Sequence, residues 1–115
     1  MERYRRFTKN NKEYARSFVK SRIEHFNGFY GFKINRIAIR NQRSRWGSCS
    51  KKSNLNFNYK ILFLKPELAD YLLVHELCHL GEFNHSERFW ALVEKTIPDY
   101  AKINKELRGM PINLI

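Results

Sequence analysis

The segment from Pro66 to Leu80 constrains the fold more than any other part of the sequence. Pro66 suits the first position of a helix, and Glu67 beside it favours the positive end of the helix dipole. Gly81 is a natural stop for such a helix. Because apolar residues surround the segment on every side, the sequence predicts a buried helix over residues 66–80. The apolar positions are Leu68, Tyr71, Leu72, Leu73, Val74, Leu77 and Leu80.

Ionisable side chains interrupt this apolar helix in the pattern HExxH, at His75-Glu76-Leu77-Cys78-His79. Residues four apart on a helix share a face, so both imidazoles can bind one metal ion while Glu76 leans toward the same site. A metal ion offsets the cost of placing these groups in an apolar interior. The alternative is a pair of buried histidines bonded to backbone carbonyls. Cys78 lies on a different helical face, where we expect it to pack.

A third histidine follows the helix. Gly81 lets the chain turn back, so that His85 can return to the metal and complete the pattern HExxHxxxxxH. A catalytic zinc site needs three protein ligands and an open fourth position, and His75, His79 and His85 satisfy that count. The sequence therefore predicts one zinc ion held by three histidines. Acidic residues that offer another third ligand, ranked below His85, are Glu82, Glu87 and Glu94.

Hydrolysis is the chemistry that such a site supports. Zinc lowers the pKa of a coordinated water to near 7, and Glu76 is positioned to act as general base on that water. A developing oxyanion needs a further donor, which the sequence leaves open. The candidate donors are Arg45, Tyr59 and Tyr100. Asp70 or Asp99 is expected to accept the second N–H of a histidine ligand.

The remaining segments predict an α+β domain. Residues 11–27 place Ala15, Phe18, Val19, Ile23 and Phe26 on one helical face, with Gly28 as the helix stop. Three β-rich runs follow at residues 33–40, 44–50 and 54–60, and the last two are predicted to form a hairpin. Leu55, Phe57 and Tyr59 alternate with asparagines, which is typical of a half-buried strand.

Helices return after the sheet. Ser86 suits the N-cap of a helix that stops near Pro98, and another helix is expected over residues 100–108. We therefore expect a single compact domain over residues 1–115, with a basic N-terminal helix region (1–30), a small antiparallel sheet of about three strands (34–60) and a helical active-site half (66–108).

Charge is divided unevenly along the chain. The net charge is +11, and residues 1–60 hold 16 Lys and Arg against 3 acids. Lys12, Arg16 and Lys20 are spaced by four on the first predicted helix and form a basic stripe. The stripe suggests DNA or another polyanion as a partner; the alternative is an ordinary solvated surface.

Two features bear on the compartment. No apolar run suggests a signal peptide or a membrane span, so no membrane contact is expected. Cys49 and Cys78 are too few for a disulfide framework and fit a reducing compartment. A cytoplasmic location and free thiols are therefore expected.

The motifs together resemble a known family. Residues 43–50 (RSRWGSCS), 55–58 (LNFN), 75–79 (HELCH) and 84–90 (NHSERFW) closely resemble the YgjP-like metallopeptidase domain, over roughly residues 34–100. The resemblance implies a zincin fold with His75, His79 and His85 as zinc ligands and Glu76 as catalytic acid and base. It also implies kinship with SprT-like and Wss-type proteases, which act on proteins bound to DNA.

The run Arg45-Trp46-Gly47-Ser48 has a predicted role of its own. An edge strand beside the metal of a zincin can bind an extended peptide by strand addition, and a glycine there lets a second backbone approach. We hypothesise that this strand forms the rim of the substrate cleft. In the alternative, Trp46 belongs to the core, Gly47 forms a bulge and the arginine is solvated.

The predicted function is hydrolysis of peptide bonds by a zinc metallopeptidase. One alternative is a non-catalytic nucleic-acid-binding module with a structural zinc, and another is a latent, DNA-associated protease. The fourth coordination position distinguishes the peptidase from the module with a structural zinc. A structural site is closed by a fourth protein ligand, whereas a catalytic site holds water there.

Overall fold

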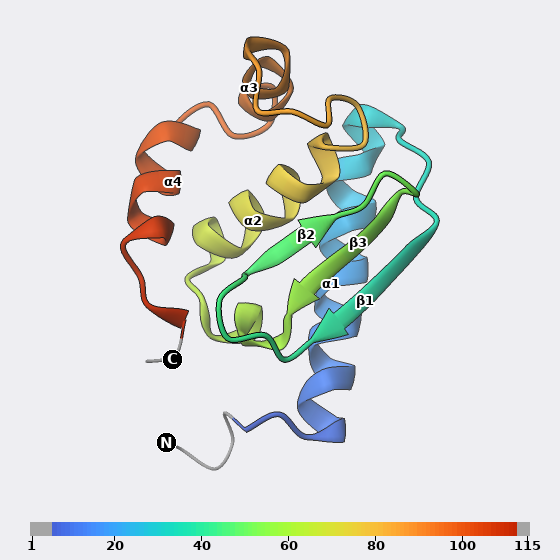
Figure 1. The fold of residues 1–115 in the computed structure, drawn as a ribbon, viewed down its shortest axis with the longest axis vertical. Helices are drawn as coiled ribbons and strands as arrows, with labels where there is room; N and C mark the ends of the chain where they lie inside the picture. The colour runs from blue at the N-terminus through green and yellow to red at the C-terminus, as the bar shows by residue number, and fades with distance from the viewer. Residues whose placement is uncertain (1–5, 113–115) are drawn as a thin grey trace.

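The computed structural model describes residues 6–112 and has the α+β class that the sequence predicts. A long helix comes first, a small sheet follows, and three helices complete the chain (Figure 1). The elements in order are α1 (Lys9–Tyr30), β1 (Arg36–Arg40), β2 (Gly47–Cys49), β3 (Asn54–Asn58), the 3-10 helix η2 (Tyr59–Phe63), α2 (Pro66–Cys78), α3 (Glu87–Glu94) and α4 (Tyr100–Arg108).

The sheet has three strands, as expected, in the order β1-β3-β2. β2 and β3 form the predicted antiparallel hairpin, in which Gly47 lies opposite Phe57. β1 instead pairs with β3 in parallel, with Arg36 opposite Asn54, so the sheet is mixed and not wholly antiparallel. After β1 the chain crosses to the far edge of the sheet, where it forms β2. It then turns back in the hairpin, so that β3 lies between β1 and β2. As a result β2 is an edge strand.

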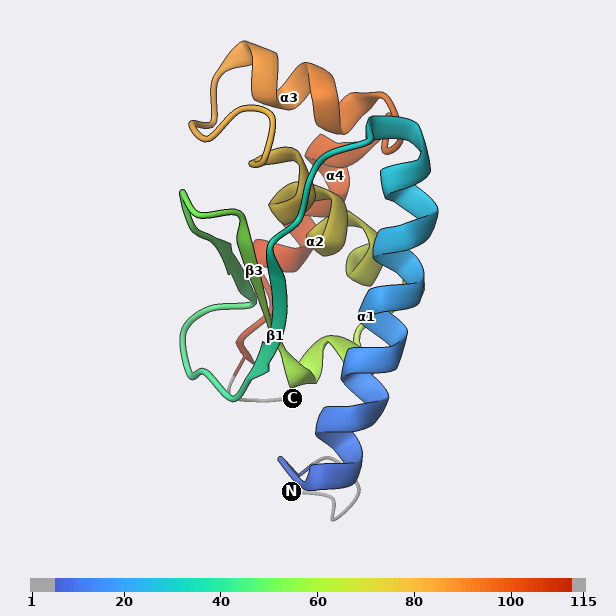
Figure 2. The ribbon, with the colours of Figure 1, turned by 90° about the vertical axis from the view of Figure 1, so that its right-hand side faces the viewer.

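The core lies between the sheet and the helices. Leu55 and Phe57 of β3 are fully buried, which confirms the predicted alternation, and Ile39 of β1 joins them. The helices α1 and α2 lie on one side of the sheet, and no helix within residues 6–112 covers the opposite face (Figure 2). On β3 the alternating residue Asn56 bonds the Ser48 hydroxyl across the strands, so the second face of the sheet is polar.

Helix α1 is longer than predicted at its C-terminal end. It begins after Thr8, whose side-chain oxygen accepts from the Asn11 N–H. Gly28, expected to end the helix, lies within it, and the helix ends at Gly31, which has φ 72°. Glycine adopts this left-handed conformation without steric penalty, and the Gly31 N–H closes the helix on the Asn27 carbonyl.

Gly28 gives a stability prediction. A Cβ added there would meet no atom within 4 Å, and the residue is exposed. Gly28→Ala should raise the free energy of unfolding by about 0.5–1 kcal/mol, because alanine loses less backbone entropy than glycine in a helix. Urea unfolding followed by circular dichroism measures this. Gly31→Ala is the matched control and should destabilise; a Gly28→Ala variant no more stable than wild type would contradict the assignment.

The helices of the second half begin where predicted, but α2 and α3 end earlier than predicted, α3 at Glu94 and not near Pro98. Ser86 is the N-cap of α3, and α4 has the predicted bounds. The third strand ends at Asn58, earlier than expected, because the Asn58 side chain accepts from the Lys60 N–H and starts η2, which takes up Tyr59. α2 ends at Cys78, after which a turn leads to Gly81. Within residues 6–112, no helix is long and apolar enough to cross a membrane.

Candidate metal centre and substrate cleft

Helix α2 and the loop after it bring three imidazoles together. One nitrogen each from His75, His79 and His85 lies within 4.8 Å of the others. The Nε2 atoms of His79 and His85 are 3.0 Å apart, a spacing that suits two ligands of one ion. In the described part of the chain the candidate ligand group consists of these three histidines, so Glu82, Glu87 and Glu94 are not part of it.

Packing at both ends fixes the path of the loop between α2 and α3. Gly81 is in close contact with Phe32, since an added Cβ would lie 2.7 Å from the Phe32 ring. The Ser86 cap then starts α3, which places the buried ring of Phe89 beneath the histidines. The Phe89 ring stacks on His79 at 4.4 Å and meets His85 edge-on at 5.0 Å. The imidazoles of His79 and His85 therefore pack against the Phe89 ring.

Two of the three histidines, His79 and His85, have a lowered pKa, which favours the neutral imidazole. Burial lowers the pKa of His79, and the neighbouring His75 lowers it further. Burial also lowers the pKa of His85. The Nδ1 atom of His79 lies 3.2 Å from the Glu82 carbonyl oxygen. Because a carbonyl only accepts, Nδ1 carries the proton and the Nε2 lone pair faces the site.

This carbonyl replaces the aspartate expected to orient a histidine. Asp70 instead accepts two hydrogen bonds from Arg22, both of 2.9 Å, and so ties α2 to α1. Asp99 is exposed at the start of α4. Neither acid contacts a site histidine, because helix α2 turns Asp70 toward α1 and Asp99 belongs to a different helix end.

Glu76 lies between the histidines and the sheet. Its side chain is buried, and Oε2 lies 3.2 Å from His75 Nδ1. Gly47 of β2 sits directly against it, since an added Cβ would lie 3.2 Å from Glu76 Cγ and 3.0 Å from the Asn56 carbonyl. The strand therefore fixes the carboxylate from one side while α2 holds it from the other.

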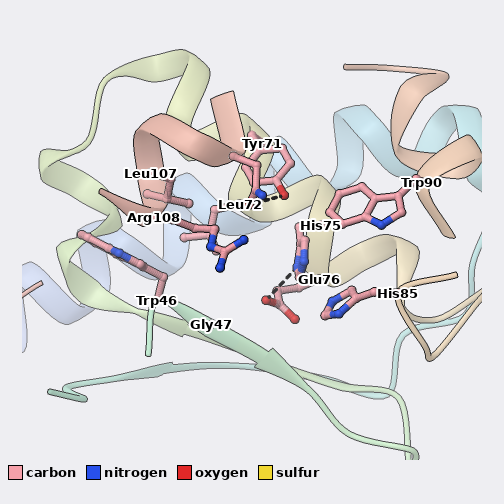
Figure 3. A pocket seen from close by; sticks show the side chains of 11 residues that line it. Trp46, Gly47, Tyr71, Leu72, His75, Glu76, His85, Trp90, Leu107 and Arg108 are labelled. Carbon is pink, nitrogen blue, oxygen red and sulfur yellow. Dashed lines mark hydrogen bonds and ion pairs between the residues drawn. The ribbon is translucent and has the colours of Figure 1, made fainter. Parts of the chain in front are cut away.

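A cavity of about 400 Å³ opens beside Glu76 (Figure 3). Trp46 and Gly47 line it, together with His75, Glu76 and His85. Gly47 and Ser48 line a neighbouring cavity of about 280 Å³ that also reaches His79 and Cys49. Three of the four rim residues expected from sequence thus border the histidines. Arg45 lines neither cavity; it is exposed, and its carbonyl accepts from Asn58.

The Cys49 side chain is a protonated thiol at neutral pH. Burial and the charge of Glu76 raise the pKa of Cys49 to about 11. Cys78 is fully buried, as expected for a packing residue, and burial raises the pKa of its thiol also to about 11. Both cysteines are free.

The expected oxyanion donors do not reach the cavity. Tyr59 is buried near Phe7, and Tyr100 stacks on Trp90 at 5.0 Å. The cavity is lined instead by three polar residues that sequence reasoning missed: Tyr71, Asn104 and Arg108. Burial raises the pKa of Tyr71, so its hydroxyl stays protonated and donates to Asn104 Oδ1 at 2.9 Å. Their spacings by four, from Tyr71 to His75 and from Asn104 to Arg108, are the signals that could have found them.

The basic stripe of α1, formed by Lys12, Arg16 and Lys20, is not part of the two cavities. Lys20 is exposed, while Lys12 and Arg16 are half-buried. Arg16 Nε lies 4.0 Å from the Glu13 carboxylate, an exposed contact of little energetic weight. The three side chains line one flank of α1, as predicted, but none lines either cavity.

Comparisons with known proteins bear on the fold and the family of the chain. The zymogen of the metallopeptidase abylysin from Pyrococcus abyssi is 28% identical, with a TM-score of 0.71 over 79% of this chain and 92% of that chain. The zymogen of jannalysin from Methanocaldococcus jannaschii is 22% identical, with a TM-score of 0.67 over 84% and 97%. No curated protein matches the sequence. The model of the YgjP-like metallopeptidase domain matches residues 2–110, and the chain therefore belongs to the YgjP-like metallopeptidase family.

Proposed function

We propose that the protein is a zinc-dependent peptidase in which His75, His79 and His85 hold one zinc ion and Glu76 is the catalytic acid and base. The observation that carries the proposal is the convergence of three imidazole nitrogens within 4.8 Å beside the buried Glu76 carboxylate. Three imidazole ligands are a donor set of catalytic zinc sites that leave one position open.

Each residue has a defined part in the reaction. A zinc ion, when bound, lowers the pKa of water to about 7 and polarises the scissile carbonyl. Glu76 takes the proton of the attacking water and passes it to the leaving amine. The Glu82 carbonyl holds His79 in the tautomer that leaves Nε2 free. Gly47 and His75 on either side keep the Glu76 carboxylate in place.

The edge strand β2 supplies a place for the substrate backbone. Asn58 N–H donates to the Trp46 carbonyl, and Ser50 N–H donates to the Asn54 carbonyl. Because bonded and non-bonded pairs alternate along an antiparallel ladder, Gly47 and Cys49 direct their backbone groups to the open side of β2. An extended peptide can pair with these groups and lie across the cavity that holds Glu76.

Gly47 tests this arrangement. Gly47→Val should lower kcat/KM on peptides by about 10²-fold, because the added atoms displace Glu76 and obstruct the backbone of the peptide. Fluorogenic peptide hydrolysis measures the effect, with zinc content determined in parallel. Gly28→Ala, on the exposed surface of α1, is the matched control and should keep wild-type turnover. Unchanged turnover in Gly47→Val would rule out β2 as the rim of the cleft.

The function itself is tested by metal analysis combined with hydrolysis of casein and peptides. The purified chain should bind one zinc ion and hydrolyse the substrate, and a chelator should stop hydrolysis until zinc is restored. A chain that binds zinc tightly but hydrolyses no peptide under any condition would contradict the proposal and favour a structural zinc.

A second candidate activity is binding of DNA or another polyanion. The observation that favours it is the absence of any acid in residues 25–66, a segment with nine Lys and Arg that include Arg36 and Arg40 on β1. Duplex binding should weaken steeply with salt and should weaken further in the triple variant Lys12→Gln, Arg16→Gln, Lys20→Gln if α1 makes the contacts. Equal peptidase activity with and without DNA would leave DNA out of the reaction.

A latent form of the peptidase is a third candidate. The observation that favours it is that the abylysin structure, 28% identical, is that of a zymogen. Turnover that appears only after limited proteolysis of the purified chain would support latency, whereas full turnover of the intact chain would exclude it.

A further inference from the structure

The cavity beside Glu76 contains one permanent positive charge. Of the residues that line it, Glu76 is the single acid and Arg108 is the single Lys or Arg. Figure 3 shows the Arg108 guanidinium pointing into the cavity, in that view between the Trp46 indole and the Glu76 carboxylate. A guanidinium is charged at every accessible pH, so the cavity has a fixed cationic end next to the catalytic carboxylate.

Helix α4 fixes the backbone of Arg108, whose side chain is exposed. Ile103 and Leu107 are buried, which fixes the helix against the core. One turn before Arg108, the side chain of Asn104 accepts the 2.9 Å hydrogen bond from Tyr71 of α2. The arginine therefore projects from a helix that is anchored to the active-site helix by both apolar and polar contacts.

No residue in the described part of the chain pairs with the Arg108 guanidinium. Within residues 6–112, no carboxylate forms an ion pair with Arg108 and no hydrogen bond satisfies it. A role at the C-terminus of α4 does not explain its direction, because Lys105 also lies in the last turn and lines no part of the cavity. An unpaired guanidinium beside Glu76 can donate two parallel N–H hydrogen bonds to a carboxylate of the substrate.

We propose that Arg108 binds a substrate carboxylate near the scissile bond, so that the preferred substrates are acidic peptides or peptide chain ends. The inference rests on the proposed peptidase function. The geometry fits both sources of a carboxylate, an Asp or Glu side chain and the free C-terminus of the substrate. A peptide paired with the open edge of β2 at Gly47 passes the guanidinium as it crosses the cavity.

Three matched peptides test the proposal on the zinc-loaded full chain. The first is blocked at both ends and carries Gln on each side of the cleaved bond, the second replaces each Gln by Glu, and the third is the Gln peptide with a free C-terminus. Wild type should show kcat/KM about tenfold or more higher for at least one carboxylate peptide than for the blocked Gln peptide. Which peptide gains identifies the source of the carboxylate. The advantage should shrink as salt rises.

Variants assign the preference to one side chain. Arg108→Gln should reduce the ratio of kcat/KM between the carboxylate and neutral peptides to about 1, while Lys105→Gln, on the same turn of α4, should keep the wild-type ratio. Arg108→Lys should keep part of it, since lysine retains the charge without the fork. A wild type without preference, or a preference that survives in Arg108→Gln, would overturn the proposal.

Binding separates this proposal from the proposed reaction. Labelled forms of the three peptides are titrated into a Glu76→Gln chain and followed by fluorescence anisotropy, which requires no turnover. Tighter binding of a carboxylate peptide that is lost on adding Arg108→Gln would support the carboxylate site even if wild type hydrolyses nothing. Equal binding of all three peptides, combined with hydrolysis of all three at equal rates, would leave the peptidase intact and remove the role of Arg108.

Discussion

Glu76→Gln should lower kcat/KM for peptide hydrolysis by about 10³-fold and leave one zinc ion bound per chain. The amide has nearly the same shape as the carboxylate, so the buried position beside Gly47 stays filled. An amide cannot take the proton of the attacking water or return it to the leaving amine. The effect should fall on kcat more than on KM, because proton transfer occurs in the transition state.

The matched control is Glu87→Gln, which makes the same chemical change at an exposed position in the first turn of α3. It should keep wild-type turnover and zinc content. Peptide hydrolysis by Glu76→Gln at the wild-type rate would exclude Glu76 as the general base, whatever the metal content of that variant.

His79→Ala should remove most of the stabilisation that zinc gives to the fold. For wild type, zinc at about a thousand times its dissociation constant should raise the free energy of unfolding by about 4 kcal/mol. In a chain of this size that corresponds to a rise in Tm of about 15 °C. Without His79 only two imidazoles remain in the cluster, and most of the rise should disappear. Thermal unfolding with and without added zinc measures the difference within each variant.

His25→Ala is the control for this experiment. His25 is exposed on α1 and contacts Phe26 and Phe29, so its removal takes away an imidazole without touching the cluster. Its zinc-induced rise in Tm should equal that of wild type. A rise that persists in His79→Ala and is lost in His25→Ala would place the metal elsewhere.

Local signals in the sequence were sufficient for the centre of the site. The apolar run over residues 66–80 predicts a buried helix, and a helical spacing of four places His75 and His79 on one face. The Ser86 cap and the bounds of α4 follow from short-range chemistry too, and the structure has both. Each of these features depends on residues within a turn or two of one another.

Features that depend on distant contacts were missed or misjudged. The parallel pairing of β1 with β3 depends on where the hairpin inserts, which no local pattern encodes. Arg108 reaches the cavity because α4 packs on α2. The partner of His79 is a backbone carbonyl, and the identity of a side chain gives no sign of it. Gly28 and Gly31 are both plausible helix stops locally, but the helix continues past Gly28 to Tyr30, whose hydroxyl donates to the distant Leu92 carbonyl.

X-ray absorption at the zinc edge of the loaded chain tests the central claim most directly, because it reports the atoms bound to the metal. The account predicts one zinc ion with three imidazole nitrogens at about 2.0–2.1 Å and one further light atom from water. A sulfur at about 2.3 Å, supplied by Cys49 of the neighbouring cavity, would close the site and contradict a catalytic metal. Fewer than three imidazoles would contradict the ligand set itself.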